Sequence, residues 1–198
     1  PLVVLTAKNL LNSKLFNEVC VVTDSDEIIE VLKKYSIRFF KSSKHYETGT
    51  DRISEFVNNF NCDLIINVQG DEPFIDPIDI DNIFNSFIAA DKNFPSNIGN
   101  IFNHEMTTLY SAHETLSSLN NPNVVKIKID ECISLDFARK IDGDNSDWFI
   151  HLGIYGYKFN CLKNFVKWEQ SKREVEFKLE QFRALDCLLY TSPSPRDT

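Results

Sequence analysis

The feature that most constrains the fold is a series of short apolar runs that alternate with segments of helical periodicity. The stretch "DLIINV" (63–68) has no polar alternation, and "EVCVVTD" (18–24) is a short run rich in β-branched residues. Strands that are apolar on both faces are typical of a parallel sheet that helices cover on both sides. The alternation therefore predicts a doubly wound α/β fold, with a mixed, mostly parallel sheet flanked by helices.

Further segments extend this alternation along the chain. In 25–35 the apolar residues recur at helical spacing, and Ser25 or Asp26 can cap that helix. The opening "LVVLTAKNLL" (2–11) is ambiguous, because its β-branched residues favour a strand whereas its later leucines continue it as a helix. We expect further helices at 50–60, 76–90 and 172–185, strands at 37–41 and 63–68, and a mixed extension of the sheet at 107–111, 124–130, 132–138 and 151–157.

Composition excludes several classes of protein. The 198 residues are 42% hydrophobic, which suits one globular domain with a core, and the net charge is -8 without any basic block that could bind nucleic acid. No apolar run reaches the roughly 20 residues that cross a bilayer, and the first residues lack signal-peptide features. We therefore expect a cytoplasmic protein without a membrane partner. The five cysteines are scattered, which predicts buried free thiols rather than disulfides or a zinc site.

The most specific local feature is "GDEP" (70–73), which follows the apolar run 64–68. In open α/β sheets, ligands bind beyond the carboxyl ends of the strands. Gly70 lets the backbone leave the strand and Pro73 stiffens the exit, so Asp71 would project into the crevice. A carboxylate there can hold magnesium, and magnesium accompanies nucleotide phosphates. The alternative is a solvated acidic turn without a ligand.

Five segments carry a resemblance to one enzyme family. They are "HYETGTDRISEF" (45–56), "INVQGDEPFI" (66–75), "NPNVVKIKID" (121–130), "HLGIYGYKFNCL" (151–162) and "EFKLEQFRAL" (176–185). In order and separation they resemble 3-deoxy-manno-octulosonate cytidylyltransferases, also called CMP-Kdo synthetases. The resemblance implies a Rossmann-like nucleotidyltransferase fold, a homodimer and a magnesium cofactor. It also implies that CTP and the acid sugar Kdo are joined to give CMP-Kdo and pyrophosphate for lipopolysaccharide biosynthesis.

The resemblance assigns the nucleotide side of the site to two motifs. Asp71 would ligate magnesium at the reacting phosphate and is the expected catalytic residue. For Gln69 the alternative is a buried, satisfied amide, and for Arg52 it is an ion pair with a helix acid such as Glu55. The residues expected to contact CTP are Thr48, Gly49, Thr50, Arg52 and Gln69.

The sugar side is assigned to three other segments. Strand alternation places residues 151, 153 and 155 on one face, and the resemblance makes His151 and Tyr155 sugar contacts. A lone strand histidine is more often a core residue, and a charged helical face is the alternative for Glu180. The residues expected to contact Kdo are Arg139, His151, Tyr155, Glu180 and Gln181; a surface arginine is the alternative for Arg139.

The two ends of the sequence depart from the family pattern. Pro1 matches the proline of the family's "GKPL" segment, so the first strand and its phosphate-binding loop are expected to be missing from residues 1–186. The tail "CLLYTSPSPRDT" (187–198) resembles one reading frame of a sequencing adapter and is interpreted as non-native. We therefore expect the 198-residue chain itself to be inactive.

Two other functions fit the same residues. One is a cytidylyltransferase for another acidic sugar, such as a sialic-acid-like nonulosonate, and assays with both sugars would separate the two. The other is a non-catalytic domain that binds a sugar nucleotide, and its mark would be a parent gene without a phosphate loop.

Overall fold

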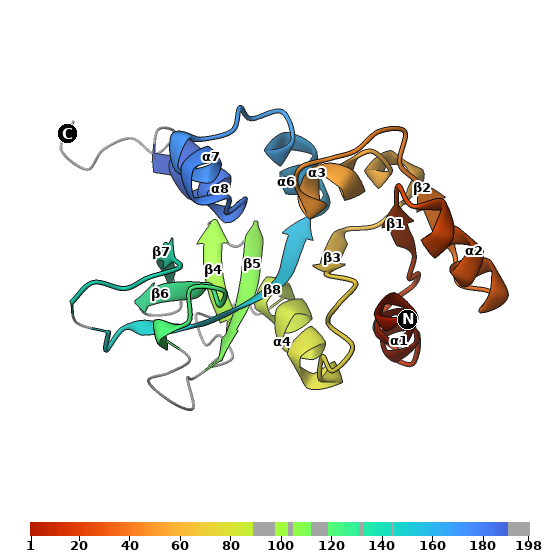
Figure 1. The fold of residues 1–198 in the computed structure, drawn as a ribbon, viewed down its shortest axis with the longest axis horizontal. Helices are drawn as coiled ribbons and strands as arrows, with labels where there is room; N and C mark the ends of the chain where they lie inside the picture. Colours follow the sequence, from red (N-terminus) through yellow and green to blue (C-terminus); the bar gives the residue numbers. More distant parts are fainter. Residues whose placement is uncertain (89–97, 103–104, 112–118, 131–132, 144, 190–198) are drawn as a thin grey trace.

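The fold combines two sheets with helices on several sides (Figure 1). The computed structural model describes residues 1–88, 98–102, 105–111, 119–130, 133–143 and 145–189. The N-terminal elements are α1 (Leu2–Leu11), β1 (Val21–Thr23), α2 (Asp26–Lys34), β2 (Phe39–Lys41), α3 (Gly49–Ser54), the 3-10 helix η1 (Val57–Asn59), β3 (Leu64–Val68) and α4 (Pro77–Ile88). They are followed by β4 (Ile98–Phe102), β5 (Met106–Ser111), β6 (Lys126–Asp130), β7 (Ile133–Ala138), β8 (Trp148–Lys158), α6 (Phe159–Phe165), α7 (Lys172–Phe177) and α8 (Gln181–Leu189).

The ambiguous opening segment is the helix α1. Its buried residues Val4 and Ala7 are three apart, which places them on one face, and they pack with Leu32 and Ile37 of the following α2–β2 unit. This apolar contact favours the helix over the strand that the β-branched residues suggested. The predicted cap of α2 is confirmed, because the Ser25 hydroxyl accepts a hydrogen bond from the backbone N–H of Ile28.

The prediction of a mostly parallel sheet is wrong. The larger sheet has six strands in the order β3-β8-β5-β4-β7-β6, with a further β6–β8 pairing, and its ladders are antiparallel except for the short β4–β7 contact. Strands β1 and β2 form a separate parallel pair. The α/β class is confirmed, but the direction of most ladders is not.

The reason for this error is that the large sheet is covered on both faces although its strands are antiparallel. On β8, Ile154 packs in one apolar cluster with Ile83 of α4, whereas Tyr155 and Tyr157 pack in another with Phe182 of α8. Alternate residues of one strand thus enter different cores. Apolar strands without alternation indicate burial on both faces, and burial alone does not fix strand direction.

The C-terminal helical segment is interrupted where the sequence predicted one helix at 172–185. Lys178 adopts a left-handed conformation (φ 53°) and ends α7, which begins with a capping box between Ser171 and Glu174. The chain then turns so that Leu179 is buried and α8 starts at Gln181. This break directs Glu180 and Gln181 toward the sheet.

Candidate active site

The first part of the site is the turn that starts α3, the segment 48–51. Thr48 is the helix cap: its hydroxyl accepts from the Asp51 backbone N–H (3.1 Å) and donates to the Asp51 carboxylate (2.8 Å). Thr50 is fully buried, and its hydroxyl lies 2.9 Å from the Tyr157 hydroxyl of β8. The turn is therefore held to the sheet by a buried hydroxyl pair.

Gln69, just after β3, lies against this turn. A Cβ placed on Gly49 would lie 3.1 Å from Gln69 Nε2, so a larger residue at this position would require the amide to shift by a few tenths of an ångström. Asn67, two residues earlier, is buried, and its Nδ2 has no hydrogen-bond partner among the described residues. The structure thus brings together Gly49 and Gln69, which the sequence assigned to one ligand.

Arg52 does not pair with Glu55, the partner considered from the sequence. Its guanidinium lies 3.7 Å from the carboxylate of Asp24, at the end of β1, whereas Glu55 accepts a hydrogen bond from the backbone N–H of Ser43. The Arg52 Nε is buried and has no partner in the described part of the chain. Arg52 is therefore tied to the β1 side of the turn.

The sugar-side residues of β8 share one face, as predicted. The rings of His151 and Tyr155 are 5.6 Å apart, and the His151 Nε2 lies 3.0 Å from the Thr108 hydroxyl. Burial lowers the pKa of His151 to about 3, so its imidazole is neutral near neutral pH. Both residues are buried, and Tyr155 donates its hydroxyl proton to Gln181 Oε1 (3.2 Å).

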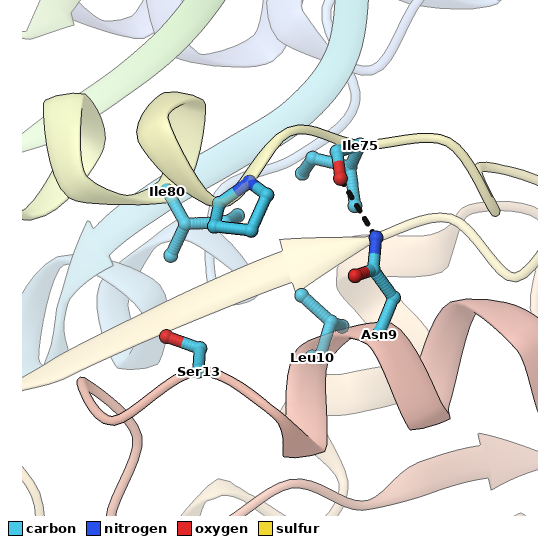
Figure 2. A pocket seen from close by; sticks show the side chains of 6 residues that line it. Asn9, Leu10, Ser13, Ile75 and Ile80 are labelled. Atoms are coloured by element: carbon cyan, nitrogen blue, oxygen red, sulfur yellow. Dashed lines mark hydrogen bonds between the residues drawn. The ribbon is translucent and has the colours of Figure 1, made fainter.

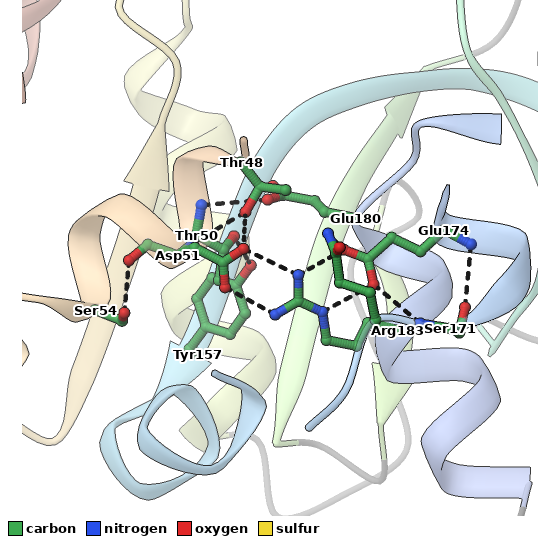
Figure 3. A network of polar contacts seen from close by, with 10 residues as sticks. Thr48, Thr50, Asp51, Ser54, Tyr157, Ser171, Glu174, Glu180 and Arg183 are labelled. Atoms are coloured by element: carbon green, nitrogen blue, oxygen red, sulfur yellow. Dashed lines mark hydrogen bonds and ion pairs between the residues drawn. The ribbon is translucent and has the colours of Figure 1, made fainter. Parts of the chain in front are cut away.

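Glu180 joins the two halves of the site (Figure 3). Its carboxylate accepts a hydrogen bond from the backbone N–H of Thr50 at 3.2 Å. Burial raises the pKa of the Glu180 carboxyl, hydrogen bonds from Thr50 and Thr48 oppose this rise, and the nearby negative charge of Asp51 adds to it. The segment expected to bind the sugar is thus in direct contact with the turn expected to bind the nucleotide.

Arg183 is a residue of this site that the sequence reasoning missed. It is 2% exposed and forms ion pairs with Asp51 of α3 and Glu174 of α7. Arg183 lies one helical turn after the buried Leu179 and next to the buried Phe182. An arginine on the apolar stripe of a helix was the signal that could have revealed it, because such a charge requires buried partners.

Asp71 lies on the turn after β3 and is exposed. Helix α1 holds both ends of the segment 70–75: the Thr6 hydroxyl donates to the Gly70 carbonyl (3.1 Å), and Asn9 Nδ2 donates to the Ile75 carbonyl (2.7 Å). Figure 2 shows the second contact beside the start of α4. The Asp71 side chain makes no ion pair with any described residue, so its oxygens are open to a hard cation such as magnesium.

Two further observations concern Arg139 and the side chains that could hold a metal ion. Arg139, which follows β7, has an exposed side chain, and its carbonyl accepts a hydrogen bond from Lys126 Nζ (2.8 Å). The structure thus places it at the end of β7 without a contact to the other predicted sugar residues. Within the described ranges, no group of three His, Cys, Asp or Glu side chains could hold a metal ion, and none of the helices is long and apolar enough to cross a bilayer.

Comparison with known proteins agrees with this arrangement. A structure described as CMP:2-keto-3-deoxy-manno-octonic acid synthetase complexed with CTP superposes with a TM-score of 0.77, at 24% identity, over 94% of this chain and 75% of that one. The two proteins therefore share a fold. The family model "Cytidylyltransferase" matches residues 1–192.

Relatives of higher sequence identity indicate which kind of cytidylyltransferase this chain resembles. The 3-deoxy-manno-octulosonate cytidylyltransferase of Chlorobium phaeobacteroides (strain BS1) is 34% identical over 98% of this chain and 80% of its own length. The same enzyme of Flavobacterium johnsoniae is 32% identical over 91% of this chain and 73% of its own. The chain belongs to the cytidylyltransferase family, among the 3-deoxy-manno-octulosonate cytidylyltransferases.

Proposed function

We propose that the protein transfers CMP from CTP to Kdo, with release of pyrophosphate, as a magnesium-dependent cytidylyltransferase. The observation that carries this proposal is the meeting of motifs that lie far apart in the sequence. Gly49 of the turn touches Gln69, and Thr50 of the same turn touches Tyr157 of β8 and Glu180. The residues expected for the nucleotide and those expected for the sugar thus adjoin one another.

The chain's own residues have distinct tasks in this reaction. The turn 48–50, together with Arg52 and Gln69, would hold the cytidine by backbone and side-chain hydrogen bonds. Asp71 fits as a magnesium ligand, because it is an exposed carboxylate just after the end of a strand. Bound magnesium would supply positive charge to the phosphates and to the departing pyrophosphate.

The sugar side would present Kdo for an in-line attack of its anomeric hydroxyl on the α-phosphorus. Positioning and electrostatics carry such chemistry, so no covalent protein nucleophile is needed. Neutral His151 would contribute a hydrogen bond and not a charge. His151, Tyr155 and Gln181 are less than a tenth exposed, whereas Glu180 is partly exposed.

The proposal includes the state of the protein in the cell. We propose a cytoplasmic homodimer whose product serves lipopolysaccharide biosynthesis. Exposed apolar side chains on neighbouring elements support a second copy as partner: Ile133 and Leu135 of β7 are about half exposed, as are Val175 and Phe177 of α7. Arg173 of α7 donates to Asp136 of β7, which joins the two elements. The mass of the purified protein in solution tests this directly.

The test of the activity is pyrophosphate release by the purified full-length protein. With CTP, magnesium and Kdo we expect turnover, and with a sialic acid in place of Kdo we expect little. Turnover with the sialic acid alone would identify the other acidic-sugar enzyme. Tight binding of CTP without pyrophosphate release from either sugar would support the non-catalytic binding domain.

A further inference from the structure

Arg183 is a buried cation in an otherwise apolar setting. Its side chain is 2% exposed, and its guanidinium carbon lies 4.7 Å from the centre of the Phe165 ring. Burying a charge is costly unless it is paired and hydrogen-bonded. The position of this arginine therefore depends on the carboxylates around it.

Two carboxylates from different elements share this guanidinium (Figure 3). Arg183 Nη1 and Nη2 donate to the two oxygens of Asp51 at 2.7 and 3.0 Å, in a bidentate pair. Its Nε and Nη2 donate to the two oxygens of Glu174 at 2.8 and 2.5 Å. One arginine thus fastens α8 to α7 and to the turn of α3, and 132 residues separate Asp51 from Arg183.

Asp51 is anionic in its pairing with Arg183. Burial alone would raise the pKa of Asp51, but hydrogen bonds from Arg183 and Thr48, together with the charge of Arg183, lower it below its usual value. Burial alone would lower the pKa of Arg183, but its hydrogen bonds to Glu174 and Asp51 raise it. Each partner is therefore fully ionised at neutral pH.

Through Asp51, Arg183 also restrains the turn 48–51. The same carboxylate that accepts from Arg183 also accepts from the Thr48 hydroxyl, which caps α3. Three residues before Arg183, Glu180 accepts a hydrogen bond from the Thr50 backbone N–H beside Gly49. The segment 180–183 therefore contacts the turn 48–51 at two adjacent residues, Thr50 and Asp51.

We propose that Arg183 is a positioning residue for the transferase reaction: through Asp51 it fixes the turn 48–51 in the conformation that receives the nucleotide. The proposal rests on the proposed function for its kinetic consequences. Arg183 need not contact the substrate in this role, because its side chain is buried beneath the turn. Loss of the Arg183–Asp51 pair should loosen the nucleotide side more than the sugar side.

The test compares Asp51→Asn and Arg183→Lys with the full-length parent enzyme. Asp51→Asn leaves Arg183 paired with Glu174, so the buried cation keeps a countercharge; Arg183→Lys keeps the charge and loses the bidentate fork. We expect the KM for CTP to rise about tenfold in each variant, with the KM for Kdo and kcat changing far less. The KM for CTP of the double variant should be no higher than that of the worse single variant, since both changes act on the turn through the Arg183–Asp51 pair.

Arg173→Lys is the matched control. Arg173 also joins two carboxylates, donating to Asp186 (2.9 Å) and Asp136 (3.0 Å), and also lies over an aromatic ring, that of Phe182. Within the described part of the chain its hydrogen bonds go to Asp186 and Asp136 and not to the turn 48–51, so its variant should lose stability without any change in the KM for CTP. A purely structural role for Arg183 predicts the same outcome for both arginines.

A second readout does not depend on activity. Amide hydrogen exchange of the turn 48–51 should be at least about tenfold faster in folded Asp51→Asn than in the parent, and unchanged in Arg173→Lys. Unchanged exchange together with an unchanged KM for CTP in Asp51→Asn would overturn the proposal. If the parent releases no pyrophosphate, the proposed function is wrong, and the exchange rate of the turn still decides whether Arg183 holds it.

Discussion

Two acidic residues of the site, Asp51 and Asp71, stand in opposite environments. Asp51 is partly buried and bound by a bidentate arginine and a threonine hydroxyl. Asp71 is exposed on a segment that α1 holds only by neutral hydrogen bonds to its backbone. A carboxylate whose charge is already neutralised is suited to hold protein structure, whereas one that keeps its charge toward solvent is suited to bind a cation.

The two carboxylates therefore belong to two regions of the site that are held in place differently. The nucleotide turn 48–51 is fixed by charges from α8, far along the chain, and the segment 70–75 is fixed by its neighbour α1. Substitutions in the first region should act on stability and nucleotide affinity. Substitutions at Asp71 should act on the chemical step with little effect on the fold.

The largest expected effect is that of Asp71→Asn on turnover. Loss of the anionic ligand at the reacting phosphate should lower kcat about 10³-fold or more, while the free energy of unfolding stays within about 0.5 kcal/mol because the residue is exposed. Steady-state pyrophosphate release over a range of magnesium concentrations measures this. Asp76→Asn is the control in the same loop, and an unchanged kcat for Asp71→Asn at saturating magnesium would remove Asp71 from the metal site.

The next largest effect should be that of Arg183→Met on stability. This change leaves Asp51 and the buried Glu174 without their cation, and breaking a buried pair in this way costs about 3–5 kcal/mol. Arg173→Met removes a half-buried arginine and should cost about 1 kcal/mol. Urea unfolding of both variants measures the difference; equal costs would show that the network around Arg183 is no stronger than a surface pair.

A smaller effect, dependent on pH, is expected for His151. Its pKa is about 3 in the folded protein against an ordinary 6.5, so the unfolded chain binds more protons between these values. Its contribution to stability is complete above about pH 6.5 and is lost as the pH falls toward 3, by up to about 1.4 kcal/mol per pH unit. The parent should therefore lose about 2 kcal/mol more than His151→Gln between pH 7 and pH 5 in urea unfolding. Parallel curves for the two proteins would contradict the burial of a neutral imidazole.

The smallest expected effect is that of Thr6→Val. The substitution removes the hydroxyl that donates to the Gly70 carbonyl, so the segment that carries Asp71 loses one of the two hydrogen bonds that hold it to α1. We expect kcat to fall about two- to fivefold with the KM for CTP unchanged. Thr6→Ser keeps the hydroxyl and should behave as the parent; a loss in Thr6→Ser without one in Thr6→Val would mean that packing of the methyl group, and not the hydrogen bond, matters.

The sequence predicted these two regions unequally well. The exposed turn at Asp71 could be foreseen, because a glycine after an apolar strand and a proline two residues after Asp71 are local signals. The ion pairs of Arg183 could not, since they depend on which distant acids the fold brings within reach. The break at Lys178, which aims Glu180 at the turn, was hidden in a segment with helical periodicity throughout.

The sheet, too, was predicted only in part from the sequence. Packing of β3 on both faces followed from its apolar residues, but its antiparallel pairing with β8 did not, because the helices that cover the sheet bury a strand in either direction. Two predicted elements extend beyond the described residues. Cys132 begins the strand predicted at 132–138, and residues 89–90 end the helix predicted at 76–90; these residues lie outside the described ranges. Helix α8 continues to Leu189, and 190–198 are likewise outside them, so the interpretation of 187–198 as a translated adapter stays a prediction.

The most direct test of the account is a crystal structure of the full-length enzyme with CTP and magnesium. We expect the cytosine against the turn 48–50 and the Gln69 amide, the Arg183–Asp51 pair intact beneath it, and magnesium about 2.1 Å from an Asp71 oxygen. A nucleotide bound away from Gly49 and Gln69, or a metal ion without Asp71 as ligand, would contradict the division of roles between the two carboxylates.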